Sequence, residues 1–189
     1  MYADGDALLM WRDVAGLHET TVPPLASFAA ISRWPGSDEF GGRPFERTIE
    51  YAQLRRLLRV LKGQGENNVC YFAYWRGLGG DLGDLLTVAT GETTWPTAAE
   101  EAASFQVRGE DYVLLAGPLD AVLPSEEALA DYGLAFPGLS PQMWWPQDGS
   151  WIIATGLDFD SSFIGANDRL AAAMLADPNL EITEVAGTM

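Results

Sequence analysis

The hydrophobic pattern predicts an amphipathic helix over residues 48–62. Leucines recur at the i, i+3, i+4 and i+7 spacing of one helical face, at Leu54, Leu57, Leu58 and Leu61. The opposite side carries Arg55, Arg56 and Arg59. Lys62 in the last turn and Gly63 after it are typical of a helix C-terminus. The basic side can bind an anion, but we favour a solvated face paired with the acidic remainder of the chain.

Apolar runs predict the strands of a sheet. Residues 69–75 read Val-Cys-Tyr-Phe-Ala-Tyr-Trp, and this nearly continuous apolar character indicates burial on both faces. Further strands are expected at residues 25–32, 85–89, 111–117, 150–157 and, as an edge strand, 180–185. Helices are expected at 126–132 and from Asn167 or Asp168 to Ala176, with a helical turn at 119–123. The pattern predicts an α+β fold, a single domain over residues 1–189 with a mostly antiparallel sheet and helices packed on one face.

Composition narrows the class of protein. The chain of 189 residues is 48% hydrophobic, too rich for a disordered chain. No apolar run approaches the roughly 20 residues that span a bilayer, and no secretory signal is visible. We therefore expect a soluble, cytoplasmic protein with no membrane partner. The single cysteine, Cys70, excludes a disulfide framework, and its strand context predicts a buried, inert thiol.

The formal net charge of −16 is unevenly distributed. Residues 1–95 hold 9 basic and 12 acidic residues, whereas residues 96–189 hold 2 basic and 15 acidic residues. Such a charge repels nucleic acid and anionic membranes, and it speeds association with basic partners. The same acidity also keeps a protein soluble, which is an alternative reason for it. If the fold interleaves the two halves, Arg55, Arg56 and Arg59 should pair with carboxylates beyond residue 96.

No catalytic set stands out in the sequence. The glycine-rich segment 77–83 has leucine where a dinucleotide fingerprint needs its third glycine, and no Gly-Lys-Ser or Gly-Lys-Thr follows. One histidine and one cysteine exclude the usual zinc sites, and no cofactor is expected. Asp158 and Asp160 lie two residues apart at a strand end, where two carboxylates can bind Mg²⁺ or Ca²⁺ or can bond local backbone amides in a turn.

The adjacent residues Trp144 and Trp145 are the second candidate site. Side chains of neighbouring residues on an extended chain point to opposite faces. One tryptophan should therefore pack inward, while the other points outward and can line a cleft or a partner site. We place the tentative binding residues at Trp144, Trp145, Asp158 and Asp160, and we assign no catalytic residue and no metal ligand.

Several blocks of the chain resemble a widespread actinobacterial family of uncharacterised proteins. The blocks are the C-terminal Ser-Pro-Gln-Met-Trp-Trp-Pro run (140–146), the run Ser-Trp-Ile-Ile-Ala-Thr (150–155), and Asp-Phe-Asp-Ser (158–161) with Gly165. The segments Tyr-Trp-Arg-Gly (74–77) and Leu-Leu-Ala-Gly-Pro-Leu (114–119) are similar to its other blocks. The resemblance covers most of the chain and implies no activity, cofactor or catalytic residue.

The sequence favours a non-catalytic binding protein over an enzyme. It would present an acidic surface and an outward tryptophan to a basic protein partner, as toxin-neutralising immunity proteins do. One alternative is a metal-assisted enzyme that uses Asp158 and Asp160. Another is a small-molecule-binding domain with a cleft beside Trp144 or Trp145.

Overall fold

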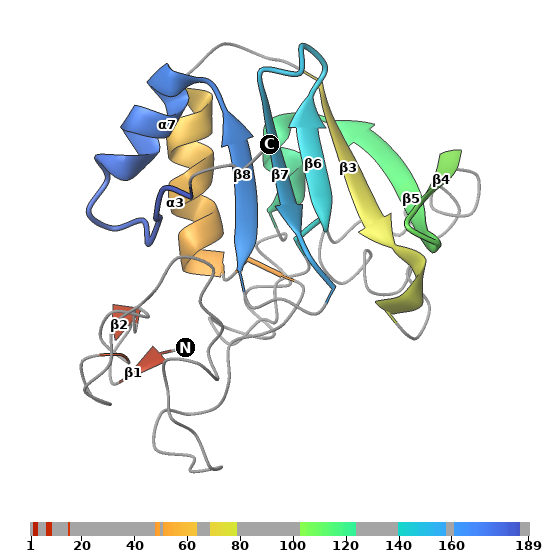
Figure 1. Cartoon of the computed structure of the whole chain (residues 1–189), viewed down its shortest axis with the longest axis horizontal. Helices are drawn as coiled ribbons and strands as arrows, with labels where there is room; N and C mark the ends of the chain where they lie inside the picture. The colour runs from red at the N-terminus through yellow and green to blue at the C-terminus, as the bar shows by residue number, and fades with distance from the viewer. Residues whose placement is uncertain are drawn as a thin grey trace.

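A computed structural model describes residues 2–3, 7–8, 15, 48–49, 51–63, 69–78, 103–123, 140–157 and 161–185. Strands β1 (Tyr2–Ala3) and β2 (Ala7–Leu8) pair as a short antiparallel ribbon near the N-terminus. The main body is a six-stranded antiparallel sheet with two α-helices, so the α+β fold class is confirmed (Figure 1). The expected elements at 25–32, 85–89 and 126–132 lie outside the described residues.

The six strands follow the order β4-β5-β3-β6-β7-β8 across the sheet. The strands are β3 (Cys70–Trp75), β4 (Ala103–Val107), β5 (Glu110–Gly117), β6 (Met143–Pro146), β7 (Trp151–Thr155) and β8 (Ser162–Ala166). Strand β3, from the first half of the chain, lies between β5 and β6 from the second half. The fold therefore interleaves the two halves that the charge count separates.

Helix α3 (Tyr51–Lys62) forms as the leucine spacing predicts. Its four buried leucines pack in one core cluster with the strand side chains Phe72, Val113, Leu115, Trp144 and Ile153. Each fully buried side chain of this size contributes about 1.5–3 kcal/mol relative to exposure. The stripe of Leu54, Leu57, Leu58 and Leu61 is therefore the main attachment of α3 to the sheet.

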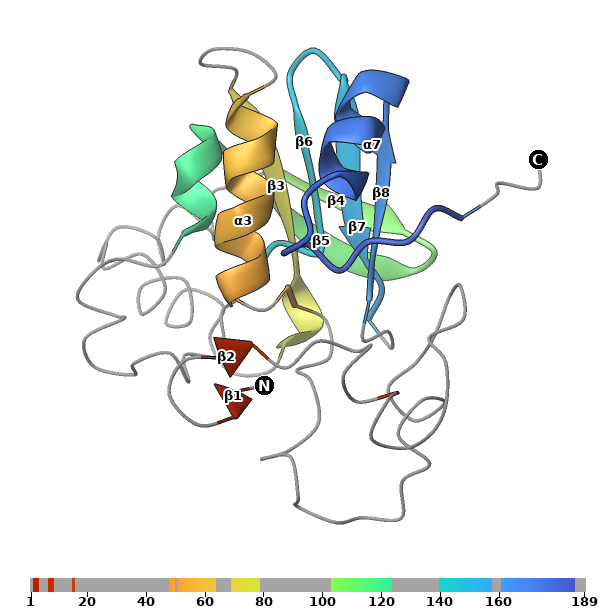
Figure 2. The same cartoon turned by 90° about the vertical axis from the view of Figure 1, so that its left-hand side faces the viewer.

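Helix α7 (Asp168–Leu175) lies on the same side of the sheet as α3, as expected for helices packed on one face (Figure 2). Asn167 is its N-cap, because the Asn167 Oδ1 atom accepts the Leu170 backbone N–H at 2.9 Å. Leu170 and Met174 point into the core. Two short 3₁₀ turns complete the described body, η2 (Arg76–Leu78) after β3 and η3 (Leu119–Val122) after β5.

The structure corrects the expected edge strand at 180–185. Residues 181–185 have no strand partner, and Leu180 and Ile182 instead pack against the core. Their alternating pattern reflects one side that touches the core rather than a sheet ladder. The edges of the sheet are β4 and β8, two strands that the hydrophobic pattern did not predict. Among the described residues, no helix is both long enough and apolar enough to cross a membrane.

Candidate functional site

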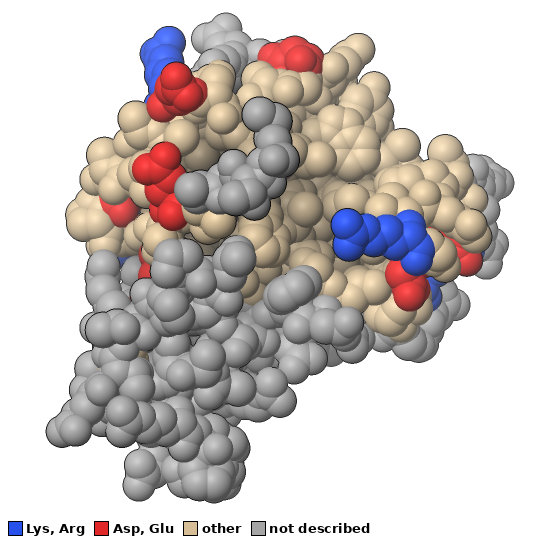
Figure 3. Space-filling view, in the orientation of Figure 1, with Lys and Arg blue, Asp and Glu red and all other residues tan. Residues whose placement is uncertain are grey.

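The face of the sheet opposite α3 and α7, here called the outer face, carries an unusual density of apolar and aromatic side chains. Strand register places on it Tyr71, Ala73, Trp75, Phe105, Tyr112, Leu114, Met143, Trp145, Ile152, Ala154 and Phe163. Ile152 is 47% exposed and Phe163 is 43% exposed, although both are large hydrophobic residues. Figure 3 shows a broad stretch of uncharged side chains on this side of the molecule. A surface of this kind is typical of an interaction site.

The tryptophan pair of β6 divides between the two faces as expected for an extended strand. Trp144 is 0% exposed and packs against Phe72 and edge-on against Trp151, with ring centroids 6.4 and 5.3 Å away. Its indole Nε1 has no hydrogen-bond partner. Trp145 is half-buried on the outer face, and its ring centroid lies 5.9 Å from that of Tyr71. Trp144 is therefore a core residue, and Trp145 is the member of the pair that reaches the surface.

A second aromatic group lies where β3 meets the start of β5. The Trp75 Nε1–H group donates a 2.7 Å hydrogen bond to Glu110 Oε2, across 35 residues of sequence. Gly77 packs on the indole, because a Cβ atom there would lie 2.2 Å from Trp75 Cζ2. The missing side chain at Gly77 therefore lets turn η2 fold back onto the ring and fix its direction.

Tyr112 and Phe105 continue this group across the sheet. Tyr112 is paired with Trp75 on one side and with Phe105 on the other, and the Phe105 and Tyr112 ring centroids are 5.6 Å apart. Burial raises the pKa of Tyr112, and the negative charge of Glu110 raises it further. We call Trp75, Phe105, Glu110 and Tyr112 the Glu110 cluster. It combines three aromatic rings with one exposed carboxylate.

A buried polar clamp holds the neighbouring backbone in place. Gln142 is almost fully buried; its Oε1 atom accepts the Trp75 backbone N–H at 2.8 Å, and its Nε2 atom donates to the Ser140 carbonyl. Ser140 Oγ accepts the Ile49 N–H at 2.7 Å and contacts the Thr48 hydroxyl at 3.0 Å. The clamp ties the end of β3 to the segments before α3 and before β6.

Cys70 is a core residue, as its strand context predicts. It is 2% exposed, and burial together with the negative charge of Asp148 raises the pKa of its thiol. A raised pKa lowers the thiolate fraction, which is the nucleophilic form. Cys70 therefore contributes packing at the end of β3 farthest from the Glu110 cluster.

The carboxylate candidates Asp158 and Asp160 lie outside the described residues. The structure describes the chain up to Leu157 in the turn after β7 and again from Ser161 before β8. Within the described ranges, no group of three His, Cys, Asp or Glu side chains is placed to hold a metal ion. The metal hypothesis for Asp158 and Asp160 stays a prediction.

The charge of the described body differs sharply from that of the whole chain. The described ranges hold seven of the eleven Lys and Arg residues but only eight of the 27 Asp and Glu residues. Lys62 pairs with Asp120 at 2.7 Å, joining α3 to η3. Arg55 instead lies over the Tyr51 ring, 5.7 Å from its centroid. The pairs with later carboxylates were expected at Arg55, Arg56 and Arg59, and the described residues contain none of them; the basic helix instead makes its pair at Lys62.

The sequence did not predict Ile152, Phe163 or Glu110 as residues of the candidate site. Ile152 and Phe163 occupy outward positions on β7 and β8, and Glu110 joins Trp75 only through the β3–β5 pairing. A signal was available for Ile152, because it lies between the inward residues Trp151 and Ile153. An isoleucine at an outward position of an antiparallel strand is a departure from the usual polar-out pattern.

Comparison with protein-family models, with curated proteins and with solved structures finds no match to this chain. The resemblance to an actinobacterial family therefore stays an expectation from sequence blocks. Its Trp-Trp-Pro block contains both the core residue Trp144 and the outer-face residue Trp145. Its Tyr-Trp-Arg-Gly block contains Trp75 and the glycine that packs on it. In both blocks, the residues have a packing role in this fold.

Proposed function

We propose that this chain is a non-catalytic binding protein that holds a basic protein partner against the outer face of its sheet. The observation that carries the proposal is the exposure of Ile152 and Phe163 beside the half-buried Trp145–Tyr71 pair. Large aromatic and aliphatic side chains of this kind contribute most of the binding energy in protein interfaces. In the part of the chain that the structure describes, both α-helices pack on the other face.

The net charge supports a basic partner rather than a second copy of the chain. Two copies would bring charges of −16 together, and their repulsion opposes association. A basic protein is attracted over a distance of roughly 10 Å at moderate salt, which raises its association rate. The described side chains of the outer face are mostly uncharged, so they offer contact area once the partner has arrived.

Selection from a random peptide library displayed on phage tests the chemistry of the partner directly. The full chain is immobilised and bound phage are eluted, and the enriched peptides are compared with the unselected library. We expect the enriched peptides to carry net positive charge and aromatic or aliphatic residues. Enrichment of neutral or acidic peptides, or no enrichment at all, contradicts the proposal.

Two matched variants locate the binding surface. Ile152→Lys and Leu175→Lys make the same change at two residues that are each 47% exposed, one on the outer face and one on α7. Because both variants alter the net charge equally, long-range attraction changes equally in both. We expect the enriched peptides to be lost on Ile152→Lys and kept on Leu175→Lys. Equal retention on both variants contradicts docking on the outer face.

A further inference from the structure

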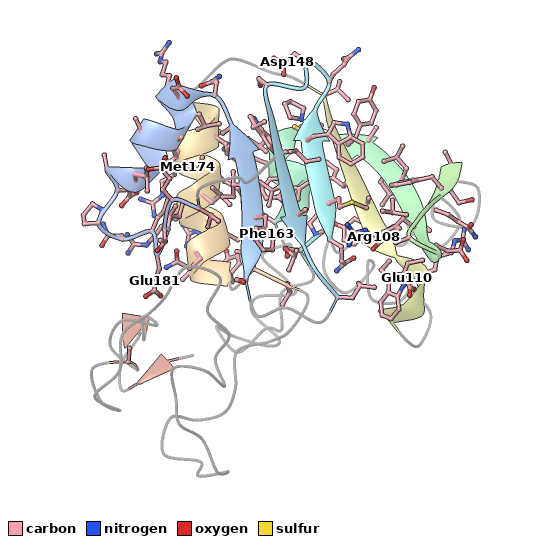
Figure 4. All side chains as sticks on the ribbon, viewed as in Figure 1. Arg108, Glu110, Asp148, Phe163, Met174 and Glu181 are labelled. Carbon is pink, nitrogen blue, oxygen red and sulfur yellow. The ribbon has the colours of Figure 1, made fainter. Side chains whose placement is uncertain are left out.

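The Glu110 cluster has the composition of a cation-binding site. Glu110 is exposed, and Trp75 Nε1 donates to one of its carboxylate oxygens at 2.7 Å. Among the described residues no other side chain hydrogen-bonds this carboxylate, so the second oxygen is available to a ligand. Figure 4 shows Glu110 at one end of the sheet, next to Arg108 in the turn between β4 and β5.

The Trp75 indole is held in place beside that carboxylate, and Tyr112 and Phe105 follow it across the sheet. Gly77 packs on the Trp75 indole, and the Gln142 side chain holds the Trp75 backbone N–H at 2.8 Å. Tyr112 is 7% exposed and lies between Trp75 and the half-buried Phe105 in the strand register. A site built from locked side chains loses little conformational entropy when a ligand binds.

Aromatic faces and a carboxylate together recognise an organic cation. The negative face of a ring attracts a cation within about 6 Å of its centroid, and a carboxylate adds charge-assisted hydrogen bonds. A guanidinium group suits this arrangement better than an ammonium group, because it is planar. It can stack on a ring while its N–H groups point sideways to an oxygen.

We propose that the Glu110 cluster binds one arginine side chain of the basic partner. The inference rests on the proposed function and names the part of the outer face that recognises positive charge. Ile152 and Phe163 then supply apolar contact elsewhere on the same face. Arg108 lies close to the cluster and carries the same charge as the ligand, so its removal should strengthen binding.

The indole N–H of Trp75 reports on the site in a two-dimensional ¹H–¹⁵N NMR spectrum. The chain has seven tryptophans, and Trp75→Phe identifies the Trp75 indole resonance by its disappearance. The full chain is titrated with acetyl-arginine amide, and in parallel with acetyl-citrulline amide, which has the same shape without the charge. We expect a saturable shift of this resonance with the arginine compound and none with the citrulline compound at equal ionic strength.

Variants separate the carboxylate from general charge effects. Glu110→Gln keeps an oxygen for Trp75 Nε1 but removes the charge, and Glu184→Gln makes the same change at an exposed residue after α7. We expect the shift to be lost in Glu110→Gln, kept in Glu184→Gln and enlarged at subsaturating ligand in Arg108→Asn. An equal shift with the citrulline compound, or a full shift in Glu110→Gln, overturns the site.

Failure of this site and failure of the proposed function give different results. Loss of the arginine-dependent shift, with basic peptides still selected and still sensitive to Ile152→Lys, overturns the Glu110 site alone. Persistence of the shift without enrichment of basic peptides overturns the protein partner alone. The NMR experiment uses a single amino-acid derivative, so its outcome does not depend on which protein carries the arginine.

Discussion

Gly77 lies directly against the indole ring of Trp75, and a methyl group at Gly77 would lie 2.2 Å from Trp75 Cζ2. The contact is with a ring that the η2 turn and the Glu110 hydrogen bond both hold in place. The two residues therefore act as one unit. The position of the indole, and of the carboxylate that it orients, depends on the absence of a side chain two residues later.

Gly77→Ala should displace the Trp75 indole and lower the free energy of unfolding by about 1–3 kcal/mol, the usual cost of overpacking. Urea unfolding measures the loss, and the Trp75 indole resonance should move. Gly117→Ala is the control, since its nearest neighbour would be an ordinary 3.4 Å away. A Gly77→Ala variant as stable as Gly117→Ala, with an unmoved resonance, contradicts the contact.

Gln142→Met should also lower the free energy of unfolding by about 1–3 kcal/mol. The change leaves the Trp75 backbone N–H without its 2.8 Å acceptor inside the protein. Gln147→Met makes the same change at an exposed position in the β6–β7 turn, where we expect little effect. Urea unfolding of the two variants checks the difference. Equal stability of the two would show that Gln142 does not clamp β3.

Arg108→Asn should raise the free energy of unfolding by about 0.5–1 kcal/mol. Arg108 and Gly109 form a two-residue turn with φ of 54° and 88°, values that favour asparagine and glycine. The opposite test is Gly109→Ala, which should destabilise although a Cβ there would meet nothing within 4 Å. Thermal unfolding distinguishes the outcomes. A loss of stability in Arg108→Asn would mean that the arginine makes contacts that outweigh its backbone strain.

Tyr74→Phe should make the free energy of unfolding fall less steeply as the pH rises above about 10. Burial raises the pKa of Tyr74 well above the value of about 10 that it has in the unfolded chain. Below pH 10 the folded and the unfolded state both keep the phenol proton of Tyr74. Ionisation of Tyr74 therefore does not lower the free energy of unfolding in this range. Above pH 10 the unfolded state releases the proton first, and stability falls by up to about 1.4 kcal/mol per pH unit. Urea unfolding between pH 8 and 11 measures the slope, and parallel curves for wild type and Tyr74→Phe contradict the assignment.

The parts of the fold that could be predicted are those with a strong local pattern. The leucine stripe of α3, the aromatic run of β3 and the Asn167 cap of α7 each have a cause within a few residues. Strands β4 and β8 lack such a cause. Strand β4 is exposed at four of five positions, and β8 contains serine, glycine and alanine. Both are strands because β5 and β7 pair with them.

The candidate site was predictable in part for the same reason. Alternation along β6 was sufficient to separate Trp144 from Trp145, although not to say which one is buried. The partnership of Trp75 with Glu110 follows from the β3–β5 register, which no local pattern specifies. Long-range pairing, rather than local propensity, assembles the outer face.

A calorimetric titration of one enriched basic peptide into three proteins decides whether the outer face is the binding surface. These are the wild type, Ile152→Lys and Leu175→Lys. The two variants carry the same added charge at different sites. Binding on the outer face requires Ile152→Lys to raise Kd about tenfold or more above that of Leu175→Lys, which corresponds to about 1.4 kcal/mol. Equal Kd values for the two variants would show that only long-range charge attracts the peptide, and they would contradict the outer face as the binding surface.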